Sequence, residues 1–222
     1  MARGARIVLL GKQGAGKGTQ AERLAEHYGI VHLSTGELFR AAARAGTAFG
    51  LEAKRYMDEG ELLPDEIVVG VIEERFADNG HLRHGFVLDG FPRTGPQAHE
   101  LNRVLDGHPL DVAIELDVPT EIVLDRLAGR RACVDCGANY HVNMPPSQPW
   151  VCDNCGGKVV QRDDDTEEAV LRRIEIYESE TLPVRDVYAE QGLLVTVDGV
   201  GDGDTVFERL TAAVDALELS SP

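Results

Sequence analysis

Short apolar runs alternate with helical patterns along most of this sequence. The apolar runs lie within residues 7–10, 30–33, 85–90, 112–117 and 193–197. Runs of this length predict strands that are buried on both faces. Between them, apolar residues recur at helical spacing, which predicts helices. The predicted helices cover 19–28, 34 through the alanines after Arg40, 47–59, a segment that begins at 64, 95–106, 119–127, 166–188 and 205–219. Pro183 is expected to bend or break the helix over 166–188.

Strands that alternate with helices predict an α/β fold with a doubly wound parallel sheet. Two insertions interrupt the alternation: a helical one at 34–63, and a cysteine-bearing one at 129–165 that shows no helical period. The predicted core domain therefore consists of residues 1–33, 64–128 and 166–222. In such sheets, ligands bind beyond the carboxyl ends of the strands.

The first strand leads directly into a glycine-rich turn that has the chemistry of a phosphate-binding loop. Gly11, Gly14 and Gly16 can adopt backbone angles that let the loop wrap an anion closely, and the next helix directs its positive end to the same place. Lys17 adds a full charge, and the Thr19 hydroxyl is suited to a magnesium ion. Gly18 separates these two residues, whereas the general motif places Ser or Thr directly after Lys.

The charge balance of the chain restricts its partners. Its 222 residues carry a net charge of −16, with a pI of about 4.8. This balance opposes nucleic-acid and acidic-membrane partners, because both reward clustered Lys and Arg. No apolar stretch approaches the length of a membrane span, and the N-terminal apolar run is too short for a signal peptide. We therefore expect a cytoplasmic protein.

One carboxylate and six arginines are candidates for phosphate chemistry. Asp89 ends a predicted strand beside the glycine-rich loop, where a carboxylate can hold magnesium against phosphates; the alternative is an ordinary Asp-Gly turn. Arginines match phosphate oxygens in bidentate geometry, although any single one is commonly a solvated surface residue. The six candidates lie at the ends of predicted elements or in the insertions: Arg40, Arg93, Arg126, Arg130, Arg162 and Arg173.

The second insertion holds all four cysteines of the chain. Cys133 and Cys136 form one C-x₂-C pair, Cys152 and Cys155 form another, and fifteen residues separate the pairs. This spacing predicts a closed tetrahedral Cys₄ zinc site, which would be structural because it leaves no open position for a substrate. The alternative is four cysteines without a metal, reduced or paired in disulfides.

Five segments together resemble the adenylate kinase family and cover nearly the whole chain. They are GAGKGTQ (14–20), HLSTGELFR (32–40), LDGFPRT (88–94) followed by Gln97, DRLAGRR (125–131), and DDD (163–165) followed by Arg173. The resemblance accounts for Gly18, because Gly-Lys-Gly-Thr is the form that this family uses. Gln13 is a departure, since family members often carry Pro there; it frees a backbone N–H and loosens the loop slightly.

The resemblance implies reversible phosphoryl transfer from ATP to AMP, giving two ADP, with magnesium and structural zinc as cofactors and a monomeric enzyme. It makes 34–63 an AMP-binding insertion and 129–165 a lid. The implied ATP contacts are Gly14, Ala15, Gly16, Lys17, Gly18, Thr19, Arg126, Arg130, Asn139, Tyr140 and Gly201. The implied AMP contacts are Thr35, Arg40, Glu61, Leu62, Leu63, Gly90, Phe91, Pro92, Arg93, Gln97, Arg162 and Arg173. The implied catalytic residues are Lys17, Asp89, Arg93, Arg130, Arg162 and Arg173.

Two other functions remain open at this stage. A kinase for UMP or CMP would share the same architecture, although Thr35 argues for AMP because relatives that prefer uridylate tend to carry a small apolar residue there. A P-loop switch with a zinc-ribbon nucleic-acid module is the second. From Arg126 to Asp165 the chain carries five basic and five acidic residues, and a Cys₄ zinc centre brings that sum to about −2. Such a surface gains nothing from counterion release.

Overall fold

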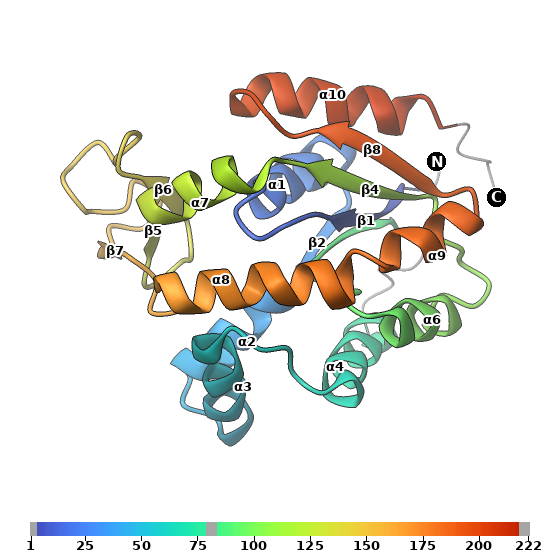
Figure 1. Cartoon of the computed structure of the whole chain (residues 1–222), viewed down its shortest axis with the longest axis horizontal. Helices are drawn as coiled ribbons and strands as arrows, with labels where there is room; N and C mark the ends of the chain where they lie inside the picture. Colours follow the sequence, from blue (N-terminus) through green and yellow to red (C-terminus); the bar gives the residue numbers. More distant parts are fainter. Residues whose placement is uncertain (1–3, 79–83, 218–222) are drawn as a thin grey trace.

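A five-stranded parallel sheet forms the centre of the protein. The computed structural model describes residues 4–78 and 84–217. Its sheet has the strand order β2-β3-β1-β4-β8, and every neighbouring pair is parallel. The strands are β1 (Arg6–Leu10), β2 (Val31–Ser34), β3 (Phe86–Asp89), β4 (Val112–Asp117) and β8 (Leu194–Asp198). Helices lie on both sides of the sheet (Figure 1), so the predicted doubly wound α/β fold is confirmed.

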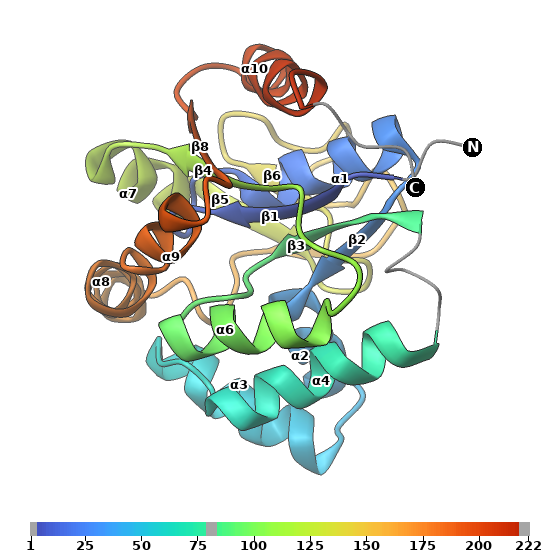
Figure 2. The ribbon, with the colours of Figure 1, turned by 90° about the vertical axis from the view of Figure 1, so that its right-hand side faces the viewer.

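Strand β1 explains why four apolar residues follow one another in the sequence. Ile7 and Leu9 pack into one hydrophobic cluster, whereas Val8 and Leu10 pack into the other. The first cluster lies under α1 (Lys17–Tyr28) and α10 (Gly203–Asp215), and the second lies under α4 (Asp65–Asp78), α6 (Gly95–Val104) and α9 (Val184–Glu190). Figure 2 shows α1 and α10 on one side of the sheet and α4 and α6 on the other. The strand is therefore buried on both faces, as predicted.

The helical insertion consists of α2 (Thr35–Arg44) and α3 (Ala48–Glu59). Both helices have side-chain N-caps: the Ser34 hydroxyl accepts from Glu37 N at 3.4 Å, and the Thr47 hydroxyl accepts from Gly50 N at 3.0 Å. A Cβ on Gly50 would lie 2.1 Å from the Ala42 carbonyl carbon. The two helices therefore meet at backbone contact, and only glycine fits at position 50.

The cysteine-bearing segment 129–165, called the lid below, contains a small sheet that the sequence did not predict. Helix α7 (Thr120–Gly129) leads into β5 (Arg130–Cys133), which pairs antiparallel with β6 (Asn139–His141) and β7 (Val159–Val160). These strands have two to four residues each and carry no regular apolar alternation. Sequence periodicity cannot detect strands this short, because segments of two to four residues are too short to show a period.

The predicted helix over 166–188 is divided into three parts. Helix α8 (Glu167–Ile176) continues into a π-helical turn, η1 (Tyr177–Thr181), and α9 begins at Val184, directly after Pro183. The break at the proline is as predicted, whereas the π-helical turn before it was not expected. The closing helix α10 ends at Asp215, and the predicted extension to Leu219 reaches beyond the described residues.

Candidate active site

The glycine-rich loop joins β1 to α1 at the carboxyl edge of the sheet. Gly14 and Gly16 have φ angles of 82° and 102°, which residues with a Cβ rarely adopt. A Cβ on Gly14 would also lie 2.8 Å from Leu127 Cγ. Helix α1 begins at Lys17, and no side chain caps its N-terminus. The first N–H groups of α1 are therefore available to an anion.

The Lys17 side chain folds back over this loop. Its Nζ donates to the carbonyl oxygens of Gly11 at 2.6 Å and of Lys12 at 2.9 Å. Burial lowers the pKa of Lys17 to about 8, Asp89 opposes that shift, and Arg93 and Arg130 add to it. The ammonium charge is thus costly in this position unless an anion compensates it.

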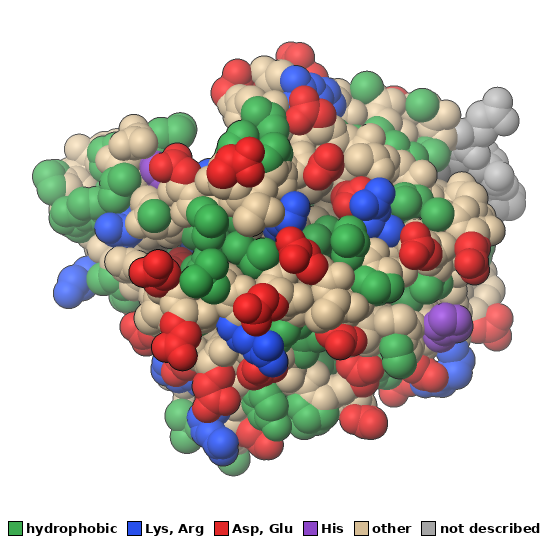
Figure 3. Space-filling view, in the orientation of Figure 1, with side chains coloured by type: hydrophobic (Ala, Val, Ile, Leu, Met, Phe, Trp, Pro, Cys, Tyr) green, Lys and Arg blue, Asp and Glu red, His purple; other side chains and the backbone are tan. Residues whose placement is uncertain are grey.

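A cleft of about 810 Å³ lies beyond the carboxyl edge of the sheet. Figure 3 shows the molecule hollowed between the lid and α10. The sequence-predicted residues that line the cleft are Gly14, Ala15, Gly16, Lys17, Gly18, Thr19, Thr35, Arg40, Glu61, Leu62, Leu63, Asp89, Gly90, Pro92, Arg93, Gln97, Arg126, Arg130, Asn139, Tyr140, Arg162, Arg173 and Gly201. Phe91 is different, because its side chain is 1% exposed and packs in the core.

All six candidate arginines line this one cleft, which the sequence alone could not establish. They come from five separate parts of the chain: α2, the segment after β3, the α7–β5 region, the end of the lid, and α8. Burial lowers the pKa of Arg93, and Arg173 and Arg40 contribute to the shift. Lys17 and the six arginines thus bring seven cationic side chains to one cleft of a strongly acidic molecule. Six acidic side chains also line the cleft: Glu22, Glu37, Glu61, Asp89, Asp164 and Asp202.

Acidic side chains hold some of these arginines in place. This role of the acids was not predicted from the sequence. Arg173 Nη2 lies 2.8 Å from Asp164 Oδ2, and Arg130 forms a bidentate pair with Asp165. Although burial opposes ionisation, Arg173 and Arg40 keep the pKa of Asp164 below its ordinary value. A signal existed in the sequence, since both acids belong to the DDD segment that carries the family resemblance.

Arg162 is a second lid arginine held by polar neighbours. Its Nη2 donates to Asn139 Oδ1 at 2.7 Å and lies 3.6 Å from Glu37 Oε1. Burial, together with Arg130 and Arg40, lowers its pKa to about 10. Asn139 thus orients a cleft arginine, and Glu37, which the sequence reasoning did not single out, supplies a counter-charge from α2.

Arg126 connects the glycine-rich loop to the far side of the cleft. Its guanidinium donates to Ala15 O at 3.1 Å and to Gly199 O at 3.2 Å. The second contact lies two residues before Gly201, which has a φ of 134° and also lines the cleft. Arg126 therefore holds together two loops that lie far apart in sequence.

The opposite wall of the cleft is built around Gly90. Thr35 Oγ1 donates to Gly90 O at 2.9 Å, and Arg93 Nε donates to the same oxygen at 2.7 Å. Gln97 Oε1 accepts from Arg93 N at 2.8 Å, and Gln97 Nε2 donates to Asp65 Oδ1 at 2.7 Å. These contacts fix the conformation of the segment after β3 and the orientation of its arginine.

Asp89 lies at the end of β3, beside the start of α1. The strand register pairs it with Leu9 on β1 and with Ser34 on β2. A Cβ on Gly18 would lie 3.5 Å from Asp89 Oδ2, which places this carboxylate against the first turn of α1. Thr19, whose hydroxyl is a second oxygen ligand, lines the same cleft. These oxygen donors fit a hard divalent cation.

The four lid cysteines form a single cluster, called the Cys₄ cluster below. Their Sγ atoms all lie within 4.8 Å of one another, and the Cys133–Cys155 and Cys136–Cys152 pairs are 3.5 Å apart. Gly137 N donates to Cys133 O, and Gly156 N donates to Cys152 O, each glycine having a positive φ. These two tight turns direct both thiols of each pair to a common point, as a metal ion requires. The Tyr140 hydroxyl donates to Cys152 Sγ at 3.4 Å.

The chain is similar to known proteins over nearly its whole length. A family model described as "Adenylate kinase" matches residues 9–193. The adenylate kinase of Methanosarcina barkeri is 50% identical over 211 residues, which cover 94% of this chain and 97% of that relative. The adenylate kinase of Thermodesulfovibrio yellowstonii is 49% identical over 213 residues, covering 95% of this chain and 99% of the relative. That of Carboxydothermus hydrogenoformans is 48% identical over 212 residues, covering 94% and 99%.

Within residues 4–78 and 84–217, no helix combines the length and the apolar character needed to cross a membrane.

The matched region contains the glycine-rich loop, the wall around Gly90 and the Cys₄ cluster, and the relatives align along almost all of the chain. Both the site and the similarity lead to one assignment: this chain belongs to the adenylate kinase family.

Proposed function

We propose that the protein catalyses reversible phosphoryl transfer from ATP to AMP, giving two ADP. The observation that most supports this proposal is a single cleft. It extends from the glycine-rich loop at one end to the wall with Thr35 and Gln97 at the other, and six arginines line it. Two anionic substrates can thus approach each other in one cleft whose arginines and Lys17 can contact their phosphates. The curated relatives at about 50% identity, which are named adenylate kinases, support the same activity.

On the ATP side, residues 14–19 receive the phosphates. The uncapped start of α1 supplies N–H donors, and Lys17, already buried at the loop, supplies the charge. Arg126, Arg130, Asn139, Tyr140 and Gly201 complete this half of the cleft. Bound magnesium neutralises phosphate charge during transfer, and Asp89 with Thr19 would hold it, directly or through water.

On the AMP side, the wall around Gly90 receives the acceptor. Thr35, Arg40, residues 61–63, Gly90, Pro92, Arg93 and Gln97 surround it, with Arg162 and Arg173 reaching from the lid and α8. Phe91 is withdrawn from this set, because its side chain packs in the core. The AMP phosphate is already ionised near neutral pH, so the site needs no strong general base. Its residues bring the two phosphates into line and neutralise the transferred group.

We further propose that 34–63 and 129–165 act as two movable domains on the remaining core. Water must be excluded, because otherwise ATP would be hydrolysed, and closure of a lid over the nucleotides is an established property of adenylate kinases. We also propose that the protein is a monomer, as its resemblance to adenylate kinases implies.

The Cys₄ cluster is proposed to hold structural zinc. Four thiolates at a Zn–S distance of about 2.3 Å lie about 3.8 Å apart in a tetrahedron, close to the 3.5 Å separations of the two cysteine pairs. Thiols that bind metal stay reduced in the cytoplasm, which is where we place the protein.

A panel of acceptors tests the proposed function. Purified protein with ATP and excess magnesium is assayed for ADP formation from AMP, UMP, CMP and GMP. We expect a kcat/KM for AMP far above that for the other three, because the similar proteins at about 50% identity are named adenylate kinases. A comparable kcat/KM for UMP or CMP would transfer the assignment to a pyrimidine monophosphate kinase, and absence of transfer to any acceptor would refute kinase function.

A further inference from the structure

Tyr140 lies between the Cys₄ cluster of the lid and the side of the lid that borders the cleft. It lies on β6, and its ring packs with Cys133, Cys152 and Val159 in the small lid core. Its hydroxyl donates to Cys152 Sγ at 3.4 Å and accepts from the backbone N–H of Asp153 at 2.8 Å. One hydroxyl therefore fixes both a metal-ligating sulfur and the backbone of the turn that follows it.

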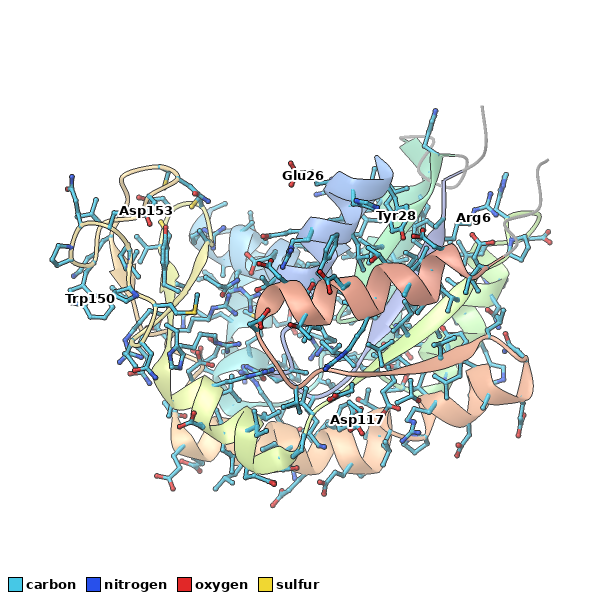
Figure 4. The ribbon with its side chains drawn as sticks, turned by 90° about the horizontal axis from the view of Figure 1, so that it is seen from above. Arg6, Glu26, Tyr28, Asp117, Trp150 and Asp153 are labelled. Atoms are coloured by element: carbon cyan, nitrogen blue, oxygen red, sulfur yellow. The ribbon has the colours of Figure 1, made fainter. Side chains whose placement is uncertain are left out.

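The same residue also borders the nucleotide side of the lid. Tyr140 lines the main cleft, and it lines a smaller cavity of about 220 Å³ between the lid and α1. Thr19 and Glu22 of α1 and Asp153 of the lid enclose that smaller cavity. In Figure 4, Asp153 is labelled in the lid, near yellow sulfur atoms. Tyr140 thus lies where the lid meets the helix that follows the phosphate loop.

The neighbouring residue of β6 strengthens this connection. Asn139 Oδ1 holds the guanidinium of Arg162 at 2.7 Å, and Arg162 lines the cleft. Strand β6, with only three residues, therefore contacts the metal ligand Cys152 through Tyr140 and the cleft arginine Arg162 through Asn139. A nucleotide on the proposed ATP side contacts β6 at Asn139 and Tyr140, and so restricts the strand that positions the Tyr140 hydroxyl.

We infer that Tyr140 is a positioning residue that couples the metal in the Cys₄ cluster to nucleotide occupancy of the cleft, through its hydroxyl bond to Cys152. The inference rests on the proposed metal and ATP sites. Groups that hydrogen-bond to metal ligands fix the orientation of those ligands. A nucleotide that holds β6 in place retains the Tyr140–Cys152 bond and slows metal loss. By linkage, any factor by which the nucleotide raises the equilibrium affinity for the metal is also the factor by which the metal raises the affinity for the nucleotide.

The test compares metal release from the full-length, zinc-loaded protein and its Tyr140→Phe variant. Zinc transfer to a chromogenic chelator is followed with and without ATP in excess magnesium. We expect Tyr140→Phe to release zinc about 10- to 100-fold faster than wild type. ATP should slow release from wild type by at least about fivefold and should lose most of this effect in the variant. The KM for ATP should rise in the variant.

Tyr28→Phe is the matched control. It also removes one bonded tyrosine hydroxyl, which donates to Asp215 Oδ1 at 2.7 Å, and Figure 4 shows Tyr28 far along the molecule from the lid. This variant should release zinc at the wild-type rate. Equal release rates from Tyr140→Phe and wild type, or equal slowing by ATP in both, would overturn the coupling alone. Wild-type protein that retains no metal would overturn the coupling and the proposed zinc site together, whereas the acceptor panel tests the kinase function separately.

Discussion

Arg130 and Asp165 form a bidentate ion pair that joins the two ends of the lid. Arg130 Nε donates to Asp165 Oδ2 at 2.7 Å, and the adjacent Nη2 donates to Oδ1. Arg130 is the first residue of β5, and Asp165 directly precedes the N-cap of α8. The Asp165 side chain is fully buried. An arginine proposed to bind phosphate is therefore also held by a carboxylate.

Asp165→Asn should lower the free energy of unfolding, and ATP should restore part of that loss. The substitution leaves the mostly buried Arg130 charge without its carboxylate, so we expect the free energy of unfolding to fall by about 3 kcal/mol. ATP supplies phosphate charge at the same place, so it should stabilise the variant more than the wild type. Urea denaturation with and without ATP in excess magnesium measures both effects.

The control for this experiment is Glu100→Gln, which breaks an exposed pair with Arg103. That loss should be below about 1 kcal/mol and independent of ATP. If the two variants lose the same stability, or if ATP stabilises Asp165→Asn no more than wild type, the Arg130–Asp165 pair does not compete with nucleotide.

Lys17→Ala and Arg93→Lys should reduce turnover far more than stability. Each removes charge or bidentate geometry at the transferred phosphate, a loss of about 3–5 kcal/mol of transition-state stabilisation, or roughly 10²- to 10⁴-fold in kcat/KM. Removing Lys17 also removes a buried ammonium whose pKa burial has already lowered to about 8, so the fold should not suffer. Steady-state kinetics and thermal melting measure the two properties.

Arg103→Lys serves as the control for Arg93→Lys, because Arg103 lies exposed on α6. It should leave kcat/KM unchanged. Wild-type turnover in Lys17→Ala or Arg93→Lys would remove the corresponding residue from the phosphate site.

ATP binding should take up protons above neutral pH. The ordinary pKa of lysine is about 10.4, and burial lowers that of Lys17 to about 8, so the free enzyme loses this charge as the pH rises through 8. Bound phosphate favours the ammonium and raises the pKa again. Calorimetry in buffers of different ionisation enthalpy should therefore show uptake approaching one proton near pH 9 and almost none from this group at pH 6.5.

The titration of Lys17 affects stability and ATP affinity in opposite directions as the pH rises. Between pH 8 and about 10.4 the unfolded chain holds a proton on Lys17 that the native protein lacks, so this group's contribution to the free energy of unfolding rises with pH. ATP affinity should fall over the same interval. Lys17→Ala should abolish the pH dependence of proton uptake, and unchanged uptake in that variant would assign the titration to another group.

The parts of the fold that local pattern could predict are those with strong periodicity. Strand β1, with apolar residues on both faces, and α1, which ends at Tyr28 directly before Gly29, follow directly from sequence spacing. The lid strands β6 and β7 do not, because segments of three and two residues carry no period. The π-helical turn at Tyr177–Thr181 was not predicted either. Pro183 predicts where the helix is interrupted, but it does not predict that the turn before it is π-helical.

The candidate site divides in the same way. Lys17 and the four cysteines could be located because their chemistry depends on short, local spacing. The counter-charges could not, because Arg130 meets Asp165 across 35 residues and Arg40 lies 3.9 Å from Asp164 across an even longer interval. Such pairs depend on tertiary packing, and charge alone does not specify which acid each arginine will meet.

Metal in the Cys₄ cluster should decide whether the lid is folded. The buried residues of the lid core are only Cys133, Cys152 and Val159, whereas Val134, Val142, Met144, Trp150 and Val151 are exposed. A core this small does not sustain a fold without a metal or a disulfide. A structural zinc site contributes on the order of 10 kcal/mol of binding free energy, which here becomes folding free energy of the lid.

Chelation of wild type, or the double substitution Cys133→Ser with Cys136→Ser, should therefore unfold the lid before the sheet. Trp150 is the single tryptophan of the chain and lies in the lid (Figure 4), so its fluorescence reports the lid, while far-UV circular dichroism reports mainly the helices and the central sheet. The fluorescence transition should move to a lower temperature than the dichroism transition, and activity should persist in part when cold but collapse on mild heating. Added zinc should restore the chelated wild type and not the double variant. Coincident transitions that chelation leaves unchanged would show that the lid folds without its metal.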